Sequence, residues 1–226
     1  MDLNTVDKLL TTTRSVRRRL DFERPVEPKI IQECLEIAIQ APTGGNAQGW
    51  HFMVVTDPQK KARIGDLYRE SFHIYARSRE EQAPPTDGRP QRDAEQGMRV
   101  VKSAVYLANR MGQVPLMIIP CINGRVEERG LMAQASLYGS ILPAAWSLML
   151  ALRARGLGSA YTTMLNGNVE QLEEILGIPP GVTTVVTFPV AYTKGIDFSA
   201  VPRRPASEIT YFDQWGFTRS RPSGDG

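Results

Sequence analysis

The sequence predicts a single α+β domain, and three observations carry this prediction. Helical patterns are long, the β-branched and aromatic runs between them are short and scattered, and no internal repeat is present. A length of 226 residues suits one sizeable hydrophobic core. The hydrophobic fraction of 42% and the charged fraction of 23% are ordinary for a globular protein, which argues against a disordered chain or a collagen-like repeat.

The first part of the chain predicts three helices and one strand. A short helical pattern covers residues 5–12, and Pro28 opens a second helix in which apolar residues recur at i, i+4 spacing. The loop after this helix leads into residues 50–55, an aromatic and β-branched run that is typical of a strand. Pro58 then begins a third helix, which we expect to reach Tyr75.

A polar stretch from residue 76 to residue 97 follows. It contains no apolar side chain larger than alanine and includes Pro84, Pro85 and Pro90, so it offers nothing to a hydrophobic core. Loops longer than about 12 to 15 residues in compact domains are usually functional or disordered. We therefore expect an insertion that acts as a lid over an active site, and the alternative is a disordered loop with no role.

The second part of the chain predicts three helices and three strands. In order, these are a helix over 98–110, a strand over 114–121, a long helix over 130–152, a strand over 159–165, a helix over 169–176 and a strand over 183–192. An irregular arm rich in proline and arginine runs from 194 to 215, and we expect 216–226 to be a flexible tail. The single domain thus covers residues 1–215.

The uncharged segment 130–152 is long enough to cross a bilayer. Polar side chains and Pro143 make its interior less apolar than a good spanning segment, so we predict a buried helix that Pro143 kinks or interrupts. Small side chains recur along it at Ser136, Ser140 and Ala144. Because such a row allows close approach, it suits a contact between subunits.

Several common kinds of site find no support. The two histidines, His51 and His73, cannot form a three-histidine metal site, and we predict no metal. Cys34 and Cys121 lie in apolar stretches without a CxxC motif, which predicts buried, reduced thiols. Neither a P-loop nor a GxSxG elbow occurs. The acidic N-terminus does not look like a signal peptide, so we expect a cytoplasmic location.

Two arginine clusters indicate a site for a phosphate. Arg14 and Arg17 offer fixed forks of donors, and Ser15 between them adds a hydroxyl. Arg203 lies in the extended arm and could reach back to the same phosphate. The alternative for both clusters is an exposed, solvated group of charges. Nucleic-acid binding has less support, because no aromatic residues are interleaved with the arginines and the chain as a whole is nearly balanced in charge.

The loop that precedes the strand at 50–55 is a third candidate for ligand binding. Gly44 and Gly45 permit close approach of the backbone to a ligand. The side-chain amides of Asn46 and Gln48 can each donate and accept hydrogen bonds, as a heterocycle or a polyol requires. By itself this loop could also be a plain connection.

Several segments of the chain occur in the order of a known family. They are Arg14-Ser15-Val16-Arg17, the loop and strand from Ala41 to Val55, Ala135-Ser136-Leu137-Tyr138, the stretch from Leu150 to Ser159, and Arg203-Arg204-Pro205. Together they resemble the FMN-dependent nitroreductase family, and most of all its single-domain actinobacterial members. The resemblance covers nearly the whole chain.

This resemblance implies a fold and a cofactor site. The fold would be a central, mostly antiparallel sheet flanked by helices, in an intertwined homodimer with two FMN sites at the subunit interface. The implied ligands of the FMN phosphate are Arg14, Ser15, Arg17 and Arg203. Asn46 and Gln48 would contact the ribityl chain or the flavin ring, with Thr43 in the same loop. The residues implied at the reactive edge of the ring are Tyr161, Thr162 and Thr163.

The implied activity is a ping-pong oxidoreduction. NAD(P)H would reduce FMN, and a nitroaromatic, quinone or similar acceptor would then take the electrons. Because the flavin carries the chemistry, we expect no catalytic acid-base pair of protein side chains. The alternatives are a specialised member that removes halogens or cleaves flavin, and a flavin store or sensor without efficient turnover. We expect no nucleic-acid or membrane partner.

Overall fold

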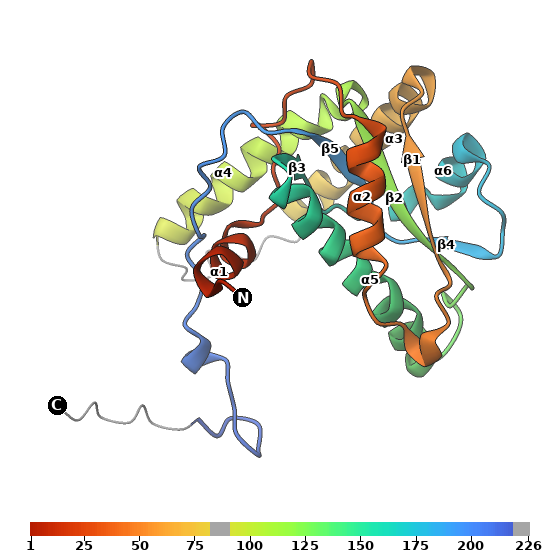
Figure 1. The fold of residues 1–226 in the computed structure, drawn as a ribbon. Coiled ribbons are helices and arrows are strands. Elements are labelled where there is room, and N and C mark those ends of the chain that lie inside the picture. Colours follow the sequence, from red (N-terminus) through yellow and green to blue (C-terminus); the bar gives the residue numbers. More distant parts are fainter. Residues whose placement is uncertain (82–90, 219–226) are drawn as a thin grey trace.

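The computed structural model describes residues 1–81 and 91–218, and these residues fold into three layers (Figure 1). A five-stranded sheet is the middle layer. The helices that cover its two faces are α2 (Pro28–Ala38) and α5 (Leu131–Ala154) on one side, and α3 (Pro58–Glu81), α4 (Gln91–Ala108) and α6 (Val169–Leu176) on the other. The predicted α+β class is confirmed.

The sheet is antiparallel at every pairing between its named strands. These strands are β1 (Trp50–Val55), β2 (Leu116–Asn123), β3 (Leu157–Ser159), β4 (Val182–Thr184) and β5 (Phe188–Tyr192). Their order is β1-β2-β5-β3, and β4 also pairs with β2. The register places Phe52 opposite Pro120 and Leu116 opposite Val190. These antiparallel pairings confirm the expected mostly antiparallel sheet.

The side chains of β2 alternate between two hydrophobic cores, one on each face of the sheet. Met117, Ile119 and Cys121 join the core formed with α3, α4 and α6. Ile118 and Ile122 join the core formed with α2 and α5. Because helices cover both faces, nearly every position in β2 is buried and the strand appears in the sequence as a continuous apolar run.

Helix α5 packs on α2 and β3. By length and composition it is the one helix of the described residues that is apolar enough to cross a membrane, and 44% of its most apolar window is buried in the fold. Ile141, Ala145 and Leu148 lie in the core beside α2. The helix continues through Pro143, so the predicted core helix is confirmed, whereas an interruption at the proline does not occur.

The polar stretch 76–97 is more helical than predicted. Residues 76–81 continue α3 and residues 91–97 begin α4. Ala76 also packs against the core between these helices. Most of the stretch predicted as a lid is therefore helix and not loop, and its middle part, residues 82–90, lies outside the described residues.

Two of the predicted strands have different bounds in the structure. The strand expected over 159–165 is wrong for most of its length, because β3 shares only Ser159 with it and a 3₁₀ turn covers Met164–Asn168. The strand expected over 183–192 is divided into β4 and β5. At the division, the Val185 N–H donates to the Pro120 carbonyl at 3.1 Å. Proline has no N–H to return the bond, and this interrupts the regular ladder.

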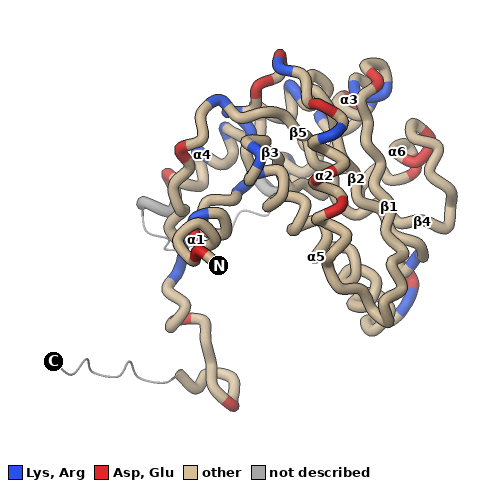
Figure 2. The backbone as a smooth tube through the Cα atoms, in the orientation of Figure 1, with Lys and Arg blue, Asp and Glu red and all other residues tan. Residues whose placement is uncertain are grey.

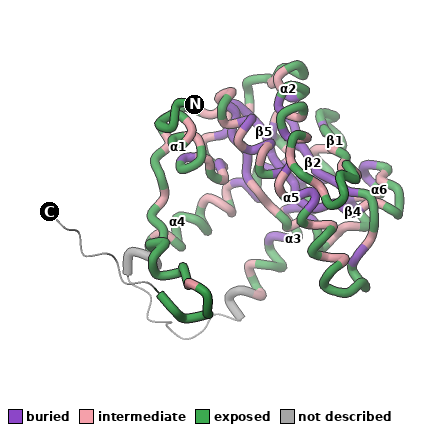
Figure 3. The backbone as a smooth tube through the Cα atoms, turned by 60° about the horizontal axis from the view of Figure 1, so that its bottom comes forward, coloured by how far each residue is buried: buried purple, intermediate pink, exposed green. Residues whose placement is uncertain are grey.

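Two segments lie outside the three layers. Helix α1 (Leu3–Thr12) contacts α5, and the arm after β5 runs past α1 and away from the sheet (Figure 1). Most of the arm is exposed (Figure 3). Its apolar side chains include Ile209, which is 56% exposed, and Trp215, which is 87% exposed. A single copy of the chain thus leaves these side chains in water.

Both cysteines are buried, which leads to a prediction about their reactivity. Burial, with a smaller contribution from Glu173, raises the pKa of Cys121 to about 12. Because the thiolate is the reactive species, we expect a thiol reagent at pH 8 to label neither cysteine in the folded protein and both after denaturation. Labelling of the folded protein at the rate of the denatured chain would contradict the burial of these thiols.

The same shift predicts a pH dependence of stability. The Cys121 thiol of the unfolded chain ionises near pH 8.5, while the folded chain keeps its proton up to about pH 12. The contribution of Cys121 to the free energy of unfolding is therefore constant below the unfolded pKa and falls as the pH rises toward 12. Chemical denaturation at several alkaline pH values, compared with a Cys121→Ala variant, measures this slope.

Candidate functional site

A cleft of about 1250 Å³ lies between segment 10–19, α4, the C-terminal half of α5 and the arm after β5. Six arginines line it, namely Arg14, Arg17, Arg18, Arg19, Arg99 and Arg203. Its two acidic residues are already paired, Glu95 with Arg99 at 3.7 Å and Asp197 with Arg19 at 2.6 Å. Figure 2 shows several of the basic positions between α1 and β3. The surplus of positive charge makes this cleft a candidate site for an anion.

Segment 14–19 lies along the sheet beside β3. Ser15 forms a parallel bridge with Ser159, and the Val16 N–H donates to the Ser159 carbonyl at 2.8 Å. Gly158 makes this close approach possible, since a Cβ there would lie 3.1 Å from the Val16 Cβ. The arginine segment is therefore held by the sheet.

Ser15 links the arginine segment to the residues that follow β3. Its Oγ accepts a hydrogen bond from the Tyr161 N–H at 3.1 Å. Because a hydroxyl can donate and accept at once, its hydrogen is still available for an anion in the cleft. The structure thus brings together two groups of residues that are far apart in the sequence.

Arg17 is a partly buried cation without a carboxylate beside it. Burial lowers its pKa, and interaction with Tyr68 opposes that shift. Its Nη1 donates to Ser103 Oγ at 3.5 Å, which is a long contact. Within the described part of the chain, no acidic side chain forms an ion pair with it. A bound anion would compensate for the loss of hydration of this guanidinium.

Arg14 and Arg203 also face the cleft. Arg14 Nη1 donates to the Ser199 carbonyl in the arm at 3.1 Å. The Arg203 side chain is exposed, and among the described residues it has neither a hydrogen bond nor an ion pair. The structure therefore brings Arg14, Ser15, Arg17 and Arg203 to one cleft, as the sequence predicted.

A second cleft of about 1150 Å³ adjoins the first, and the lining residues that the two share include Arg17, Tyr161 and Arg203. Thr162 and Thr163 line the second cleft. Most of its aromatic and aliphatic lining comes from α3 and α4, namely Tyr68, Phe72, Tyr75, Ala76, Val100, Val101 and Ala104. The three residues predicted at the ring edge, 161–163, thus lie at the junction of a cationic cleft and an apolar one.

Tyr68 is a site residue that the sequence did not reveal. Its hydroxyl lies 3.2 Å from Thr162 Oγ1, and its side chain is buried. Burial raises the pKa of Tyr68, and the Thr162 hydrogen bond and the Arg17 charge oppose that shift. The hydroxyl is thus neutral near pH 7 and can donate. In the sequence, Tyr68 has the helical spacing of an ordinary core residue, so no signal distinguished it.

The loop with Thr43, Asn46 and Gln48 lies elsewhere, and these residues line neither cleft. Gly44 N–H donates to Ser140 Oγ, in the N-terminal half of α5, at 3.0 Å. Residues from the C-terminal half of α5 line the cationic cleft, so the loop and the cleft lie beside different parts of this helix. Within one chain, the structure does not bring the three loop residues to the other predicted ligands.

The backbone of this loop has an unusual conformation. The φ angles of Gly45, Asn46 and Gln48 are 58°, 54° and 50°. Left-handed backbone is uncommon for residues other than glycine. Two hydrogen bonds stabilise it here, from the Gln48 N–H to Thr43 Oγ1 and from Gln48 Nε2 to Asn46 Oδ1, each at 3.2 Å. Such backbone is often found where a loop holds a ligand.

Comparison with known sequences gives related oxidoreductases. An iodotyrosine deiodinase of Drosophila melanogaster is 28% identical over 205 residues, which cover 89% of this chain and 67% of that protein. An NADH dehydrogenase of Thermus thermophilus is 28% identical over 180 residues, which cover 74% of this chain and 76% of that protein.

Solved structures share the fold. The FMN-dependent nitroreductase NfnB from Mycobacterium smegmatis, in complex with NADPH, has a TM-score of 0.67 at 20% identity and covers 94% of this chain and 100% of its own. Oxidized iodotyrosine deiodinase bound to FMN and 3-iodo-L-tyrosine has a TM-score of 0.66 at 20% identity and covers 88% of this chain and 95% of its own. The model of the nitroreductase family matches residues 10–192. This chain therefore belongs to the nitroreductase family.

Proposed function

We propose that this protein is an FMN-dependent oxidoreductase that passes electrons from NAD(P)H to a nitroaromatic, quinone or similar acceptor. The observation that carries the proposal is Arg17, a partly buried cation without an acidic partner among the described residues, beside Arg14 and Arg203. The phosphate of FMN has the charge and the acceptor oxygens that such a set of donors binds. Membership of the nitroreductase family and the FMN-bound structures of its relatives support this cofactor.

The residues of the two clefts would divide the work of binding. Arg14, Arg17 and Arg203 would bind the phosphate, and Ser15 would donate its hydroxyl hydrogen. When bound, FMN supplies the transfer of hydride and electrons. Residues 161–163 would orient the flavin ring at the junction of the clefts. Tyr68 would hold Thr162 in place, and the apolar walls of the second cleft would exclude water and receive the acceptor.

The position of the loop at 43–48 supports a homodimer. Its residues were expected to contact FMN, yet they lie away from the clefts of their own chain. We propose that the loop of one copy completes the cofactor site of the other. The shape of the loop is fixed by its left-handed backbone and its hydrogen bonds, so it is already organised for such a contact.

The dimer is a testable prediction. Apolar side chains of α5 stay exposed in one chain, with Leu131 at 81%, Met132 at 87% and Trp146 at 41%. We expect light scattering at micromolar concentration to give twice the monomer mass, because an obligate interface commonly buries more than about 2,000 Å² of such surface. A monomeric mass with flavin fully bound would contradict the shared site.

The cofactor and the activity can be tested on the purified protein. We expect it to be yellow and to release FMN, not FAD, on denaturation, because the arginine set suits one terminal phosphate. Anaerobic mixing with NADH or NADPH should bleach the bound flavin, and a nitroaromatic or quinone should restore its colour. A protein that binds FMN but is not bleached by either nicotinamide would be a store or sensor instead.

Reductive dehalogenation is the second candidate, and the iodotyrosine deiodinases among the relatives favour it. The same preparation separates the two reactions. Oxidation of the pre-reduced flavin by 3-iodo-L-tyrosine, with release of iodide, would support a dehalogenase. Oxidation by quinones and nitroaromatics but not by the iodinated amino acid would support the first proposal.

A further inference from the structure

The segment from Lys194 to Phe198 connects β5 to the part of the arm that carries Arg203, and little apolar burial holds it. Ile196 is 72% exposed, and the Asp197 side chain is 88% exposed. Of these five residues, Phe198 alone packs against a hydrophobic core. The course of the segment must therefore depend on polar contacts.

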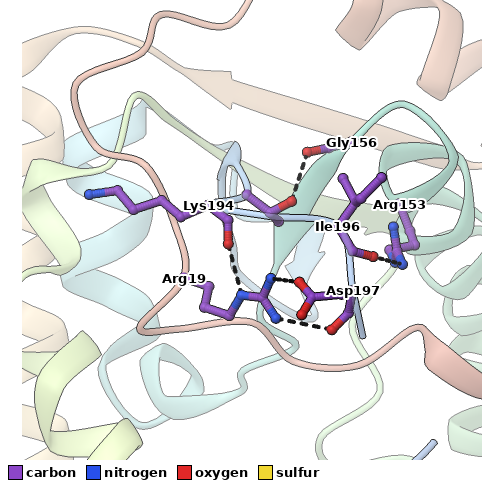
Figure 4. A network of polar contacts seen from close by, with 7 residues as sticks. Arg19, Arg153, Gly156, Lys194, Ile196 and Asp197 are labelled. Carbon is purple, nitrogen blue, oxygen red and sulfur yellow. Dashed lines mark hydrogen bonds and ion pairs between the residues drawn. The ribbon is translucent and has the colours of Figure 1, made fainter. Parts of the chain in front are cut away.

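Arg19 supplies most of these contacts, and it uses all three guanidinium nitrogens (Figure 4). Nε donates to the Lys194 carbonyl at 2.8 Å, and Nη1 donates to the Asp197 carbonyl at 3.3 Å. Nη2 forms the ion pair with Asp197 Oδ1 at 2.6 Å. An exposed ion pair alone contributes little, but three bonds from one rigid fork fix both the position and the direction of the backbone.

Arg153, in the last turn of α5, holds the segment from a second element. Its Nη2 donates to the Ile196 carbonyl at 3.1 Å (Figure 4). The Cζ atoms of Arg19 and Arg153 lie 4.3 Å and 4.8 Å from the centroid of the Phe198 ring. Both guanidinium groups are thus within the range of cation–π attraction to one ring.

The backbone of the segment fits closely around Arg19. Gly195 has a φ of +80°, and a Cβ at this position would lie 2.5 Å from Arg19 Nη2. The Lys194 N–H donates to the Arg19 carbonyl at 2.7 Å. Arg19 therefore joins the arginine segment, residues 14–19, to the start of the arm at Lys194. Arg203 follows Phe198 by five residues, so fixing Phe198 limits the reach of Arg203 to about 17 Å.

We propose that Arg19 and Arg153 are positioning residues that fix the arm so that Arg203 reaches the phosphate of FMN. They would act on the cofactor through the arm and not by contact with it. This inference rests on the proposed function. It predicts that Arg19 affects FMN affinity through Arg203 and does not affect the affinity for a flavin that lacks the phosphate.

A double-mutant cycle tests this prediction. The dissociation constants of FMN and riboflavin are measured by fluorescence quenching for Arg19→Ala, Arg203→Ala and the double variant. We expect each single variant to raise the FMN dissociation constant about tenfold, the lower end of the range for a charged hydrogen bond. The double variant should bind FMN less than about threefold more weakly than either single variant does. Riboflavin affinity should be unchanged in all three.

Three further variants serve as controls. Lys194→Ala removes a positive charge from the same segment but leaves the backbone contacts in place, so we expect no change in FMN affinity. Asp197→Asn removes only the exposed ion pair and keeps both contacts of Arg19 to backbone carbonyls, so it should fold and change FMN affinity by less than about threefold. Arg19→Lys keeps the charge without the rigid fork and should restore only part of the affinity.

The outcomes separate this inference from the proposed function. If the two substitutions act independently, the FMN dissociation constant of the double variant rises about a hundredfold. This result would show that Arg19 contacts the phosphate itself and would overturn the positioning role. An equal loss of riboflavin affinity would also overturn it. If the unmodified protein binds no flavin, the proposed function itself fails. If it binds FMN and Arg203→Ala has no effect, the positioning role fails while the cofactor assignment stands.

Discussion

The Arg14→Ala, Arg17→Ala double variant is expected to lose most of its bound FMN while remaining folded. Each charged hydrogen bond to the phosphate contributes about 1.5 to 3 kcal/mol, so the two together correspond to a weakening of at least a hundredfold. The loss should be greater for Arg17, which is partly buried, than for the exposed Arg14. Titration of the apoprotein with FMN measures both effects.

A loss of FMN affinity that comes from lower positive charge in general must be distinguished from one that comes from lost contacts to the phosphate. Lys29→Ala, Lys60→Ala is a matched control, because both side chains are exposed and line neither cleft. This control should bind FMN with unchanged affinity. Riboflavin binding to the arginine variant should also be unchanged, since riboflavin has no phosphate. Full flavin occupancy of the arginine variant would show that the phosphate lies elsewhere.

Gly65→Ala is expected to cause a large loss of stability. A Cβ on Gly65 would lie 2.5 Å from the Gly112 nitrogen and 2.7 Å from its Cα, so α3 would have to separate from the 3₁₀ turn at Met111–Gln113. Because both partners are backbone, neither can move aside as a side chain would. We expect a loss of about 3 kcal/mol or more, which lowers the melting temperature by roughly 6 to 12 °C.

Gly97→Ala is the matched control for that variant. Gly97 is also helical, in α4, and a Cβ there would meet no atom within 4 Å. Alanine is a better helix former, so stability should rise by about 0.5 to 1 kcal/mol. Thermal unfolding of both variants at one protein concentration gives the comparison. A Gly65→Ala variant as stable as Gly97→Ala would contradict the close packing of α3.

The sequence predicted best the elements whose ends carry a local signal. Helix α2 begins at Pro28, α3 begins at Pro58, and the helix expected over 169–176 is α6 to the residue. Helix α6 ends at Gly177, whose φ of 68° favours glycine. Such signals lie in the chain itself and do not depend on packing.

In the polar stretch 76–97, the absence of large apolar residues wrongly indicated a loop. Helices form through local hydrogen bonds, and Glu, Gln, Arg and Ala have high helix propensity, so residues 76–81 and 91–97 can be helical although they contain no large apolar side chain. Its three prolines all fall at 84–90, between the two helices. Proline position was the better indicator of where the helices could not continue.

The candidate site was predictable in its chemistry but not in its geometry. The residue types of Arg14, Ser15 and Arg17 indicated a phosphate, and the structure places them with Arg203 in one cleft. Sequence order could not indicate that the loop with Asn46 and Gln48 would lie apart from this cleft. Nor could it single out Arg19, whose neighbours in the cluster have a different role.

The separation of that loop from the cleft has a thermodynamic consequence. If the phosphate is bound by one copy and the ring is completed by the loop of another, association of two copies and binding of the cofactor are linked reactions. Each must then strengthen the other by the same factor. Excess FMN would hold the two copies together, and dilution of the protein would release flavin even at a fixed concentration of free FMN. The visible absorbance of a dilution series would therefore report on subunit association.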